Sequence, residues 1–145
     1  MSRFSQTFSR LRSGLLFAPL YGVATIGYGL VSMVWSRFDG DGRRQHRTAQ
    51  AWARMLLRIA RVQVHVEGAG NLPLGQPMVI TCNHLSYMDV PVLFASLPLQ
   101  FRILAKAGLF RIPFLGGHLQ RAQHLPVDQS NARASMRSLQ QAAAA

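Results

Sequence analysis

The sequence has few acidic residues and a single cysteine. Five Asp and Glu residues stand against sixteen Lys and Arg residues, so the formal net charge of the 145-residue chain is +11. A cationic excess of this size indicates an anionic partner, which is nucleic acid, an anionic membrane surface or a phosphorylated substrate. The lone cysteine, Cys82, excludes an internal disulfide and a cysteine-rich zinc site. Because Cys82 lies in an apolar run, we expect a buried and unreactive thiol.

Nucleic-acid binding and metal binding have little support in the pattern of residues. The chain has no RNP-like motif, no zinc-finger spacing and no interleaving of aromatic with basic side chains, so we expect no nucleic-acid partner. Its histidines are scattered and its aspartates are single, so we expect no metal. Arginines instead bracket an apolar segment, which favours a membrane surface. These arginines are Arg3, Arg10, Arg12, Arg37, Arg43, Arg44 and Arg47.

Charge is absent from residues 13–36, a stretch rich in large apolar residues. About 20 such residues cross a bilayer as a helix, and Gly and Pro are tolerated better there than in water. We therefore predict an amino-terminal membrane-embedded helix that either spans the bilayer or lies deep in its interface. A signal peptide fits less well, because the apolar part is too long and no small-residue cleavage site follows. A buried core helix is the simplest alternative. Arginines on both sides leave the orientation open.

A turn signal, Asp39-Gly40-Asp41-Gly42, separates this segment from the next. From Gln45 to Val62, apolar residues recur every three or four positions and arginines occupy other faces, which predicts an amphipathic helix. This helix either covers a core or lies on anionic lipid. We therefore divide the chain into a basic segment with the membrane helix at 1–38, a linker with the amphipathic helix at 39–62, and a domain at 63–145.

The rest of the chain alternates between strand and helix signals. The predicted strands are 62–68, 78–82, 101–105 and 125–127, and the predicted helices are 90–97, part of 109–119, and 130–145. We expect Ser86 or Asp89 to cap the first of these helices and Ser130 to cap the last. The pattern predicts an α/β fold with a partial mixed sheet flanked by helices. Because the last helix calls for a returning strand, we expect the chain to be the amino-terminal piece of a longer protein.

The segment Asn83-His84-Leu85-Ser86-Tyr87-Met88-Asp89 places an imidazole and a carboxylate five positions apart, directly after a predicted strand. A histidine held by a carboxylate is a general base. A His-x4-Asp pair alone occurs by chance in roughly one chain in six of this length, whereas the added Asn and Ser reduce chance agreement to about one in a few thousand. Ligands of open α/β sheets bind at the carboxyl ends of strands, which favours an active site. The structural alternative is a helix cap at Asp89 and a loop shaped by His84 and Asn83.

This segment is similar to the NHxSxxD motif of the glycerolipid acyltransferases, the PlsC-like 1-acylglycerol-3-phosphate acyltransferases. Lys106 followed by Ile112-Pro113-Phe114-Leu115-Gly116 resembles the KxExxxxPxxG segment of that family, and Leu125-Pro126-Val127-Asp128 resembles its strand ending in Asp-Arg. The chain departs from the family where Gly108 replaces the acidic residue and Gln129 replaces the arginine. The later EGTR-like motif does not occur within the sequence, so this piece alone is expected to be inactive.

The resemblance implies transfer of a fatty acyl group from acyl-CoA or an acyl carrier protein thioester to a lysophosphatidate-type hydroxyl, without a cofactor. In that reaction His84 would be the general base and Asp89 its partner. Asn83 and Ser86 would support the motif, and Lys106 would bind substrate.

The implied partners are membrane lipids, the acyl thioester donor and a lysophospholipid acceptor. The implied location is a membrane, taken to be the bacterial inner membrane with the active site facing the cytoplasm. Two alternatives stay open: a membrane-bound lipid-binding protein with a degenerate site, and a hydrolase that uses the same His–Asp pair on water.

Overall fold

The computed structural model describes residues 17–113, 115–128, 130 and 132–143. The chain divides into two compact units. The first unit combines the residues up to Val31 with Arg47–Leu99, and the second combines Ser32–His46 with Gln100–Ala145. Each unit therefore draws on two stretches that are distant in sequence.

The apolar amino-terminal segment forms helix α2 (Ala18–Trp35), which confirms the predicted helix over its described part. By length and composition, this helix is able to cross a membrane. Its one buried residue is polar, Ser32, whereas six of its large apolar side chains are at least 48% exposed. These side chains belong to Leu20, Val23, Ile26, Leu30, Val31 and Val34. A helix that turns its apolar side outward is the reverse of a water-soluble surface helix, so its outer side fits lipid or another apolar partner.

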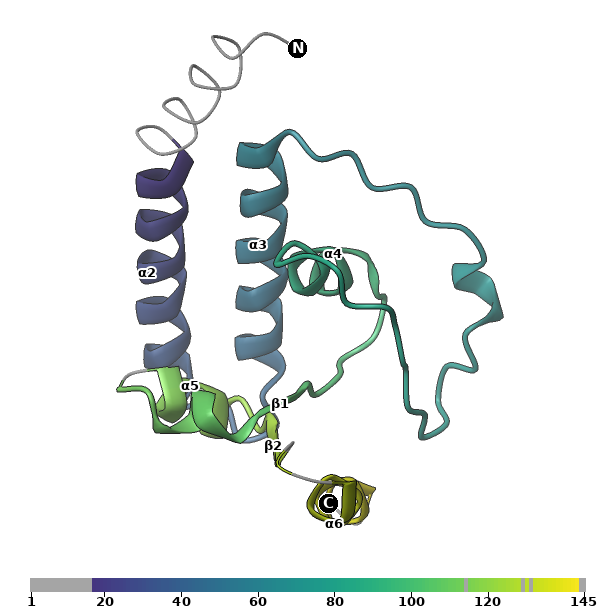
Figure 1. The fold of residues 1–145 in the computed structure, drawn as a ribbon. Coiled ribbons are helices and arrows are strands. Elements are labelled where there is room, and N and C mark those ends of the chain that lie inside the picture. Colours follow the sequence, from purple (N-terminus) through teal and green to yellow (C-terminus); the bar gives the residue numbers. More distant parts are fainter. Residues whose placement is uncertain (1–16, 114, 129, 131, 144–145) are drawn as a thin grey trace, which may run out of the picture. The chain divides into compact units, whose positions relative to one another are not determined.

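Helix α3 (Arg43–Ala60) is the predicted amphipathic helix, beginning and ending two residues earlier than expected. Its buried apolar residues are Ala53, Leu56 and Leu57. Its exposed arginines include Arg47, Arg54 and Arg58. In the first unit, α2 and α3 lie side by side and antiparallel (Figure 1), and Trp52 Nε1 donates a hydrogen bond of 3.1 Å to Thr25 Oγ1. The basic side predicted for this helix is therefore exposed while its apolar side forms part of the core.

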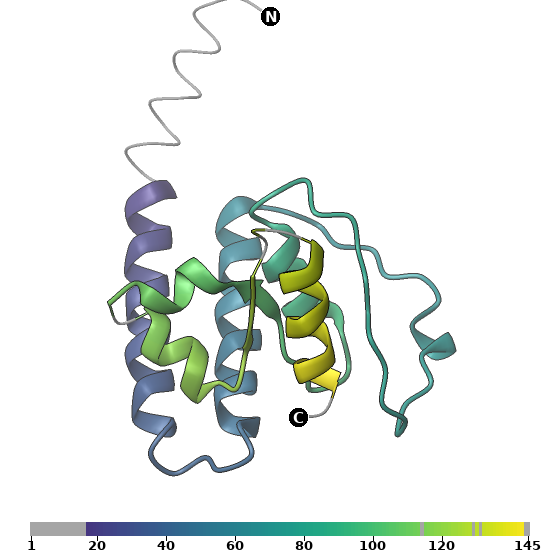
Figure 2. The same ribbon diagram turned by 60° about the horizontal axis from the view of Figure 1, so that its bottom comes forward.

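Residues 61–88 form a long loop that leaves α3 and returns to helix α4 (Figures 1 and 2), and it contains the short 3-10 helix η2 (Ala69–Asn71). Both strands predicted within this loop are wrong. Neither 62–68 nor 78–82 pairs with a strand in the described part of the chain. Apart from Val64 and Met78, the residues of these segments are exposed. A strand needs hydrogen-bonded neighbours, which alternation in sequence does not supply. Cys82 is likewise exposed rather than buried, which corrects the expectation for its thiol.

Helix α4 (Asp89–Ser96) confirms the short helix predicted at 90–97 and buries Pro91 and Phe94. Its N-cap residue is Met88, whose side chain makes no capping hydrogen bond, so the expected capping by Ser86 or Asp89 is wrong. The Ser86 hydroxyl and the Asp89 carboxylate instead accept hydrogen bonds from backbone amides that precede the helix. Both side chains therefore serve the loop rather than the helix.

The second unit holds a two-stranded parallel sheet, rather than the mixed sheet that was predicted. Strands β1 (Leu104–Lys106) and β2 (Leu125–Val127) pair with Leu104 opposite Leu125 and Lys106 opposite Val127. β1 is thus shorter than the strand predicted at 101–105, and β2 is confirmed. The 3-10 helix η3 (Ala107–Arg111) and helix α5 (Leu115–Arg121) connect them. Helix α5 lies partly within the segment 109–119 predicted as helical, and it includes Gly116 and Gly117.

Gly116 lies where α5 touches η3. A Cβ at this position would come within 2.0 Å of the backbone oxygen of Phe110, and the Gly116 amide donates a 2.8 Å hydrogen bond to Ile112 O. The neighbouring Gly117 is different, because a Cβ there meets nothing within 4 Å. Close backbone packing therefore explains the glycine that ends the PxxG-like segment.

His124, which precedes β2, forms a hydrogen bond with Ile103, which precedes β1. Its Nδ1 accepts a hydrogen bond of 3.2 Å from the Ile103 amide. Burial lowers the pKa of His124 to about 4, with smaller effects in the same direction from His118, Arg102 and His46. The imidazole is therefore neutral near pH 7, as an acceptor at Nδ1 requires.

Helix α6 (Ala132–Ala143) follows β2 and confirms the predicted final helix over its described part. It is joined to the strand end through Asp128, whose carbonyl oxygen accepts a 2.7 Å hydrogen bond from Ser135 Oγ and whose amide donates to Ser138 Oγ at 3.3 Å. The Ser130 amide donates to Asp128 Oδ1 at 2.9 Å. The expected cap at Ser130 depends on residue 131, which lies outside the described residues, as does Gln129.

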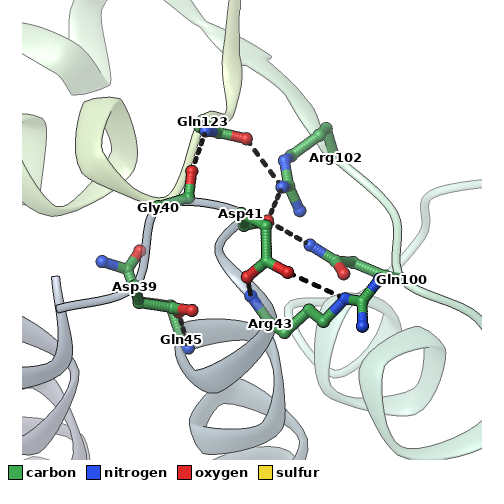
Figure 3. Close-up of polar contacts among 8 residues, drawn as sticks. All are labelled: Asp39, Gly40, Asp41, Arg43, Gln45, Gln100, Arg102 and Gln123. Atoms are coloured by element: carbon green, nitrogen blue, oxygen red, sulfur yellow. Dashed lines mark hydrogen bonds and ion pairs between the residues drawn. The ribbon is translucent and has the colours of Figure 1, made fainter.

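The turn between α2 and α3 is held by three side chains of the second unit (Figure 3). Gly40 O accepts a hydrogen bond from Gln123 Nε2 at 3.3 Å, and Asp41 O accepts from Gln100 Nε2 and Arg102 Nη2, both at 2.8 Å. Arg102 Nη2 also donates to Gln123 Oε1 at 2.7 Å. Gly42 completes the turn with a φ of +71°, and a Cβ there would come within 2.9 Å of Arg102 Nη2. The positive φ favours glycine at this position, whereas the end of the Arg102 side chain could move to make room for a Cβ.

Candidate active site

His84 and Asp89 lie in contact at the end of the long loop. His84 Nδ1 is 2.9 Å from Asp89 Oδ2, so the pairing of side chains predicted from their spacing is confirmed. His84 belongs to the irregular backbone before α4, whereas Asp89 is the first residue of the helix. The helix start therefore fixes the carboxylate, and the loop before it brings the imidazole back to that carboxylate.

A single oxygen of Asp89 organises the loop. Asp89 Oδ2 accepts hydrogen bonds from the amides of Leu85 and Ser86, both at 2.8 Å, in addition to its contact with His84. The Ser86 hydroxyl accepts a further hydrogen bond from the Met88 amide at 3.1 Å. The two amide donors were missed in the sequence, because backbone groups carry no residue signal.

The electrostatics of the site favour an ionised carboxylate. The Ser86 amide is the largest influence that lowers the pKa of Asp89, and the His84 side chain and the Leu85 amide act in the same direction against partial desolvation. A carboxylate that accepts several hydrogen bonds keeps its charge because the donors favour the charged form. Asp89 therefore provides a fixed negative charge beside the imidazole at neutral pH.

The imidazole is accessible from outside the protein. The His84 side chain is 63% exposed, whereas that of Asp89 is 28% exposed. When Nδ1 donates its hydrogen to Asp89, the lone pair of a neutral imidazole lies at Nε2. The arrangement can therefore accept a proton from a molecule that approaches from solvent or from a membrane surface.

The other predicted site residues, Asn83 and Lys106, have fewer contacts than His84 and Asp89. Asn83 lies in the exposed loop, and no hydrogen bond joins its side chain to the described part of the chain. Lys106 is exposed at the end of β1, in the second unit, whereas His84 and Asp89 belong to the first. No group of three or more His, Cys, Asp or Glu residues gathers as metal ligands within the described ranges.

Comparison with known proteins gives a family match over more than half of the chain. The profile of the family described as Acyltransferase matches residues 63–145. A chloroplastic 1-acyl-sn-glycerol-3-phosphate acyltransferase of Arabidopsis thaliana is 29% identical over 138 residues, which cover 88% of this chain and 37% of that protein. A lyso-ornithine lipid O-acyltransferase of Pseudomonas aeruginosa is 34% identical over 119 residues, covering 79% of this chain and 44% of that protein.

Shorter matches agree with these two. A 1-acyl-sn-glycerol-3-phosphate acyltransferase of Bacillus subtilis is 36% identical over 69 residues, which cover 47% of this chain and 35% of that protein. The chain thus spans 35–44% of the length of these three relatives. No solved structure gives a significant match.

Proposed function

The chain belongs to the Acyltransferase family, and from that membership we propose that it acts in glycerolipid synthesis by moving a fatty acyl group from a thioester to a lysophosphatidate-type hydroxyl. The observation that carries the proposal is the 2.9 Å contact between His84 Nδ1 and Asp89 Oδ2 within an exposed loop. The names of the relatives support the lipid class of the acceptor.

In the proposed reaction His84 is the general base. Its Nε2 takes the proton of the acceptor hydroxyl as the hydroxyl oxygen attacks the thioester carbonyl carbon. The carbon–sulfur bond then breaks, and the imidazolium returns its proton to the departing thiolate, so that ester and free thiol are formed. No covalent intermediate on the protein is needed.

Asp89 supports this proton transfer in two ways. Its contact with Nδ1 selects the tautomer in which Nε2 is the acceptor, and its negative charge favours the imidazolium that forms. Its bonds to the amides of Leu85 and Ser86 hold the loop so that the imidazole keeps this position. Asp89 thus acts through His84 and is a positioning residue.

The acceptor and the site of action follow from other features. We assign Lys106 to binding the anionic head of the substrate, since it is the single lysine and is exposed at a strand end. We place the reaction at a membrane, since α2 exposes its apolar side and a lysophospholipid is a membrane component. A lyso-ornithine lipid is the competing acceptor, because one relative carries that name.

Because the chain spans 35–44% of the length of these relatives, the proposal is tested with the product of the complete open reading frame. This protein is reconstituted in liposomes with an acyl thioester and lysophosphatidate, and phosphatidate is measured by chromatography. His84→Ala should lower the rate of acyl transfer about 10²- to 10⁴-fold, the usual share of a general base. His65→Ala is the matched control, since His65 is also exposed in the same loop but lies outside the pair. It should retain the wild-type rate.

The products distinguish the competing functions. Transfer to lyso-ornithine lipid but not to lysophosphatidate would replace the proposed acceptor and support the proposed acyl-transfer reaction. Free fatty acid formed equally with and without acceptor would identify a hydrolase. Lipid binding without thioester consumption would identify a lipid-binding protein. Wild-type acyl transfer by folded His84→Ala protein would remove His84 from the mechanism.

A further inference from the structure

The turn that follows α2 gathers aromatic and cationic side chains at one end of an apolar helix. We call it the basic turn and define it by Trp35, Arg37, Phe38, Arg43 and Arg44. All five residues belong to the second unit and are exposed. None of them takes part in the chemistry proposed for His84.

The aromatic residues of the basic turn have the character of a membrane interface. Trp35 is 37% exposed and Phe38 is 71% exposed. The guanidinium carbon of Arg44 lies 5.0 Å from the centroid of the Trp35 ring, within the range of a cation–π contact. An indole that contacts a guanidinium and stays 37% exposed suits the headgroup level of a bilayer, where amphipathic rings are enriched.

The two acidic residues of the turn, Asp39 and Asp41, offset part of the charge of its three arginines and leave a net positive charge. Asp39 Oδ2 accepts a hydrogen bond from the Gln45 amide at 2.8 Å, which turns it toward the start of α3. Asp41 lies 2.9 Å from Arg43 Nε and neutralises that arginine. Neither aspartate forms an ion pair with Arg37. Asp39 also interacts electrostatically with Arg44 and offsets part of its charge, so the cationic surface of the turn is carried chiefly by Arg37, with a smaller share from Arg44.

The clamp drawn in Figure 3 holds the turn in one conformation. The carbonyl oxygens of Gly40 and Asp41 accept three hydrogen bonds from side chains of the second unit, and Gly42 has a backbone conformation that favours glycine. Holding the backbone in place reduces the entropy lost when the arginines bind a ligand. The turn is therefore organised before any partner arrives.

We propose that the basic turn binds the headgroups of anionic phospholipids at the end of α2. Lipid fits better than other anions, because the turn continues directly from a helix that exposes Leu30, Val31 and Val34. Each arginine near an anionic surface contributes about 1 kcal/mol, which corresponds to roughly a fivefold preference for anionic over zwitterionic lipid. This inference rests on the membrane embedding of α2 proposed above and is independent of the reaction at His84.

Tryptophan fluorescence tests the proposal in the full chain. With Trp52→Phe as background, Trp35 is the one tryptophan left, since the chain has two. The protein is placed in zwitterionic vesicles containing a small, equal fraction of brominated phosphatidylglycerol or brominated phosphatidylcholine, and quenching of Trp35 is compared. Brominated phosphatidylglycerol should quench more strongly, with an apparent association constant at least about fivefold higher, because headgroup binding enriches it around Trp35.

Two matched variants locate the effect. Arg37→Gln/Arg44→Gln should lose the preference for the brominated anionic lipid. Arg54→Gln/Arg58→Gln removes the same charge from exposed positions of α3 and should keep it. Circular dichroism confirms that each variant is folded.

The other possible results show which part of the proposal is wrong: headgroup recognition, its assignment to the basic turn, or the embedding of this end of α2. Equal quenching by both lipids would overturn headgroup recognition while leaving α2 in the membrane. Equal loss of preference in the two arginine variants would overturn the assignment to the basic turn, because overall charge would explain it. Quenching by neither lipid would refute both the inference and the embedding of this end of α2, without bearing on acyl transfer.

Discussion

Replacing Asp89 by asparagine separates the two roles assigned to its carboxylate. The asparagine side chain keeps an oxygen that can accept the hydrogen bonds from the Leu85 and Ser86 amides, both now 2.8 Å long. It loses the negative charge beside His84 Nδ1. We therefore expect Asp89→Asn to keep the fold and the loop but to slow acyl transfer.

The size of the effect follows from the exposure of the pair. Complete loss of a general base slows a reaction about 10²- to 10⁴-fold. The His84 side chain is 63% exposed, so water replaces part of the support that the carboxylate provides. We therefore expect kcat to fall by about 10²-fold, the lower end of that range, with little change in KM. Asp89→Ala also removes the acceptor of two amides and should fall as far as His84→Ala.

Steady-state kinetics of the single and double variants check this reasoning. If Asp89 acts through His84, then the double variant His84→Ala/Asp89→Asn should be no slower than His84→Ala alone, because residues that act as a unit are not additive. Nitrogen NMR of the His84 ring should show hydrogen at Nδ1 in the wild type and a mixture of tautomers in Asp89→Asn.

The pH dependence of the loop provides an independent readout. Because hydrogen bonds lower the pKa of Asp89, the order that it gives the loop is present above about pH 4, the usual pKa of an aspartate. That order is lost only as the pH falls through the lowered folded-state value. Glu67→Gln, in the exposed part of the same loop, is the matched control and should leave the pH dependence of the loop unchanged. Wild-type kcat in folded Asp89→Asn protein, or additive losses in the double variant, would refute the assigned role.

Three further predictions concern stability and reactivity. Gly116→Ala should destabilise the fold by about 1–3 kcal/mol or more, because its Cβ overlaps a backbone oxygen of η3, whereas Gly117→Ala should be neutral or up to about 1 kcal/mol stabilising in thermal melts. Stability should fall by about 3 kcal/mol as the pH drops from 6.5 to 4, since the folded state resists protonation of His124. His124→Asn, which keeps an acceptor and removes the titration, should flatten that dependence; an unchanged slope would assign it to other groups. Cys82 should react with a maleimide as fast in the native protein as in urea, and strong protection would contradict its exposure.

The helices could be predicted from sequence and the strands in the long loop could not. Periodicity and local composition determine where α3 and α4 form, because a helix satisfies its backbone within one segment. The alternation at 62–68 indicates a segment able to pair, but a ladder also needs a neighbouring strand at the right register. The two strands that did form, β1 and β2, pair with each other. The predicted bounds of β2 were correct, whereas the predicted start of β1 was three residues too early.

The candidate site shows the same division. The contact between His84 and Asp89 followed from the motif and its spacing, because four intervening residues let the loop fold back onto the helix start. The role of the Asp89 carboxylate as acceptor for two loop amides did not follow. From the sequence we expected this carboxylate to accept hydrogen bonds as a helix cap. Whether it accepts from the helix or from the loop depends on backbone dihedrals that the sequence does not specify.

The long loop of residues 61–88 has a practical consequence for work with this protein. It carries two short stretches suited to extended pairing, 62–68 and 78–82, and neither meets a strand in the part of the chain that is described. Open segments of this kind join between molecules at high concentration. Self-association is therefore expected to limit a purified sample before heat does, so dilution should preserve it better than cooling.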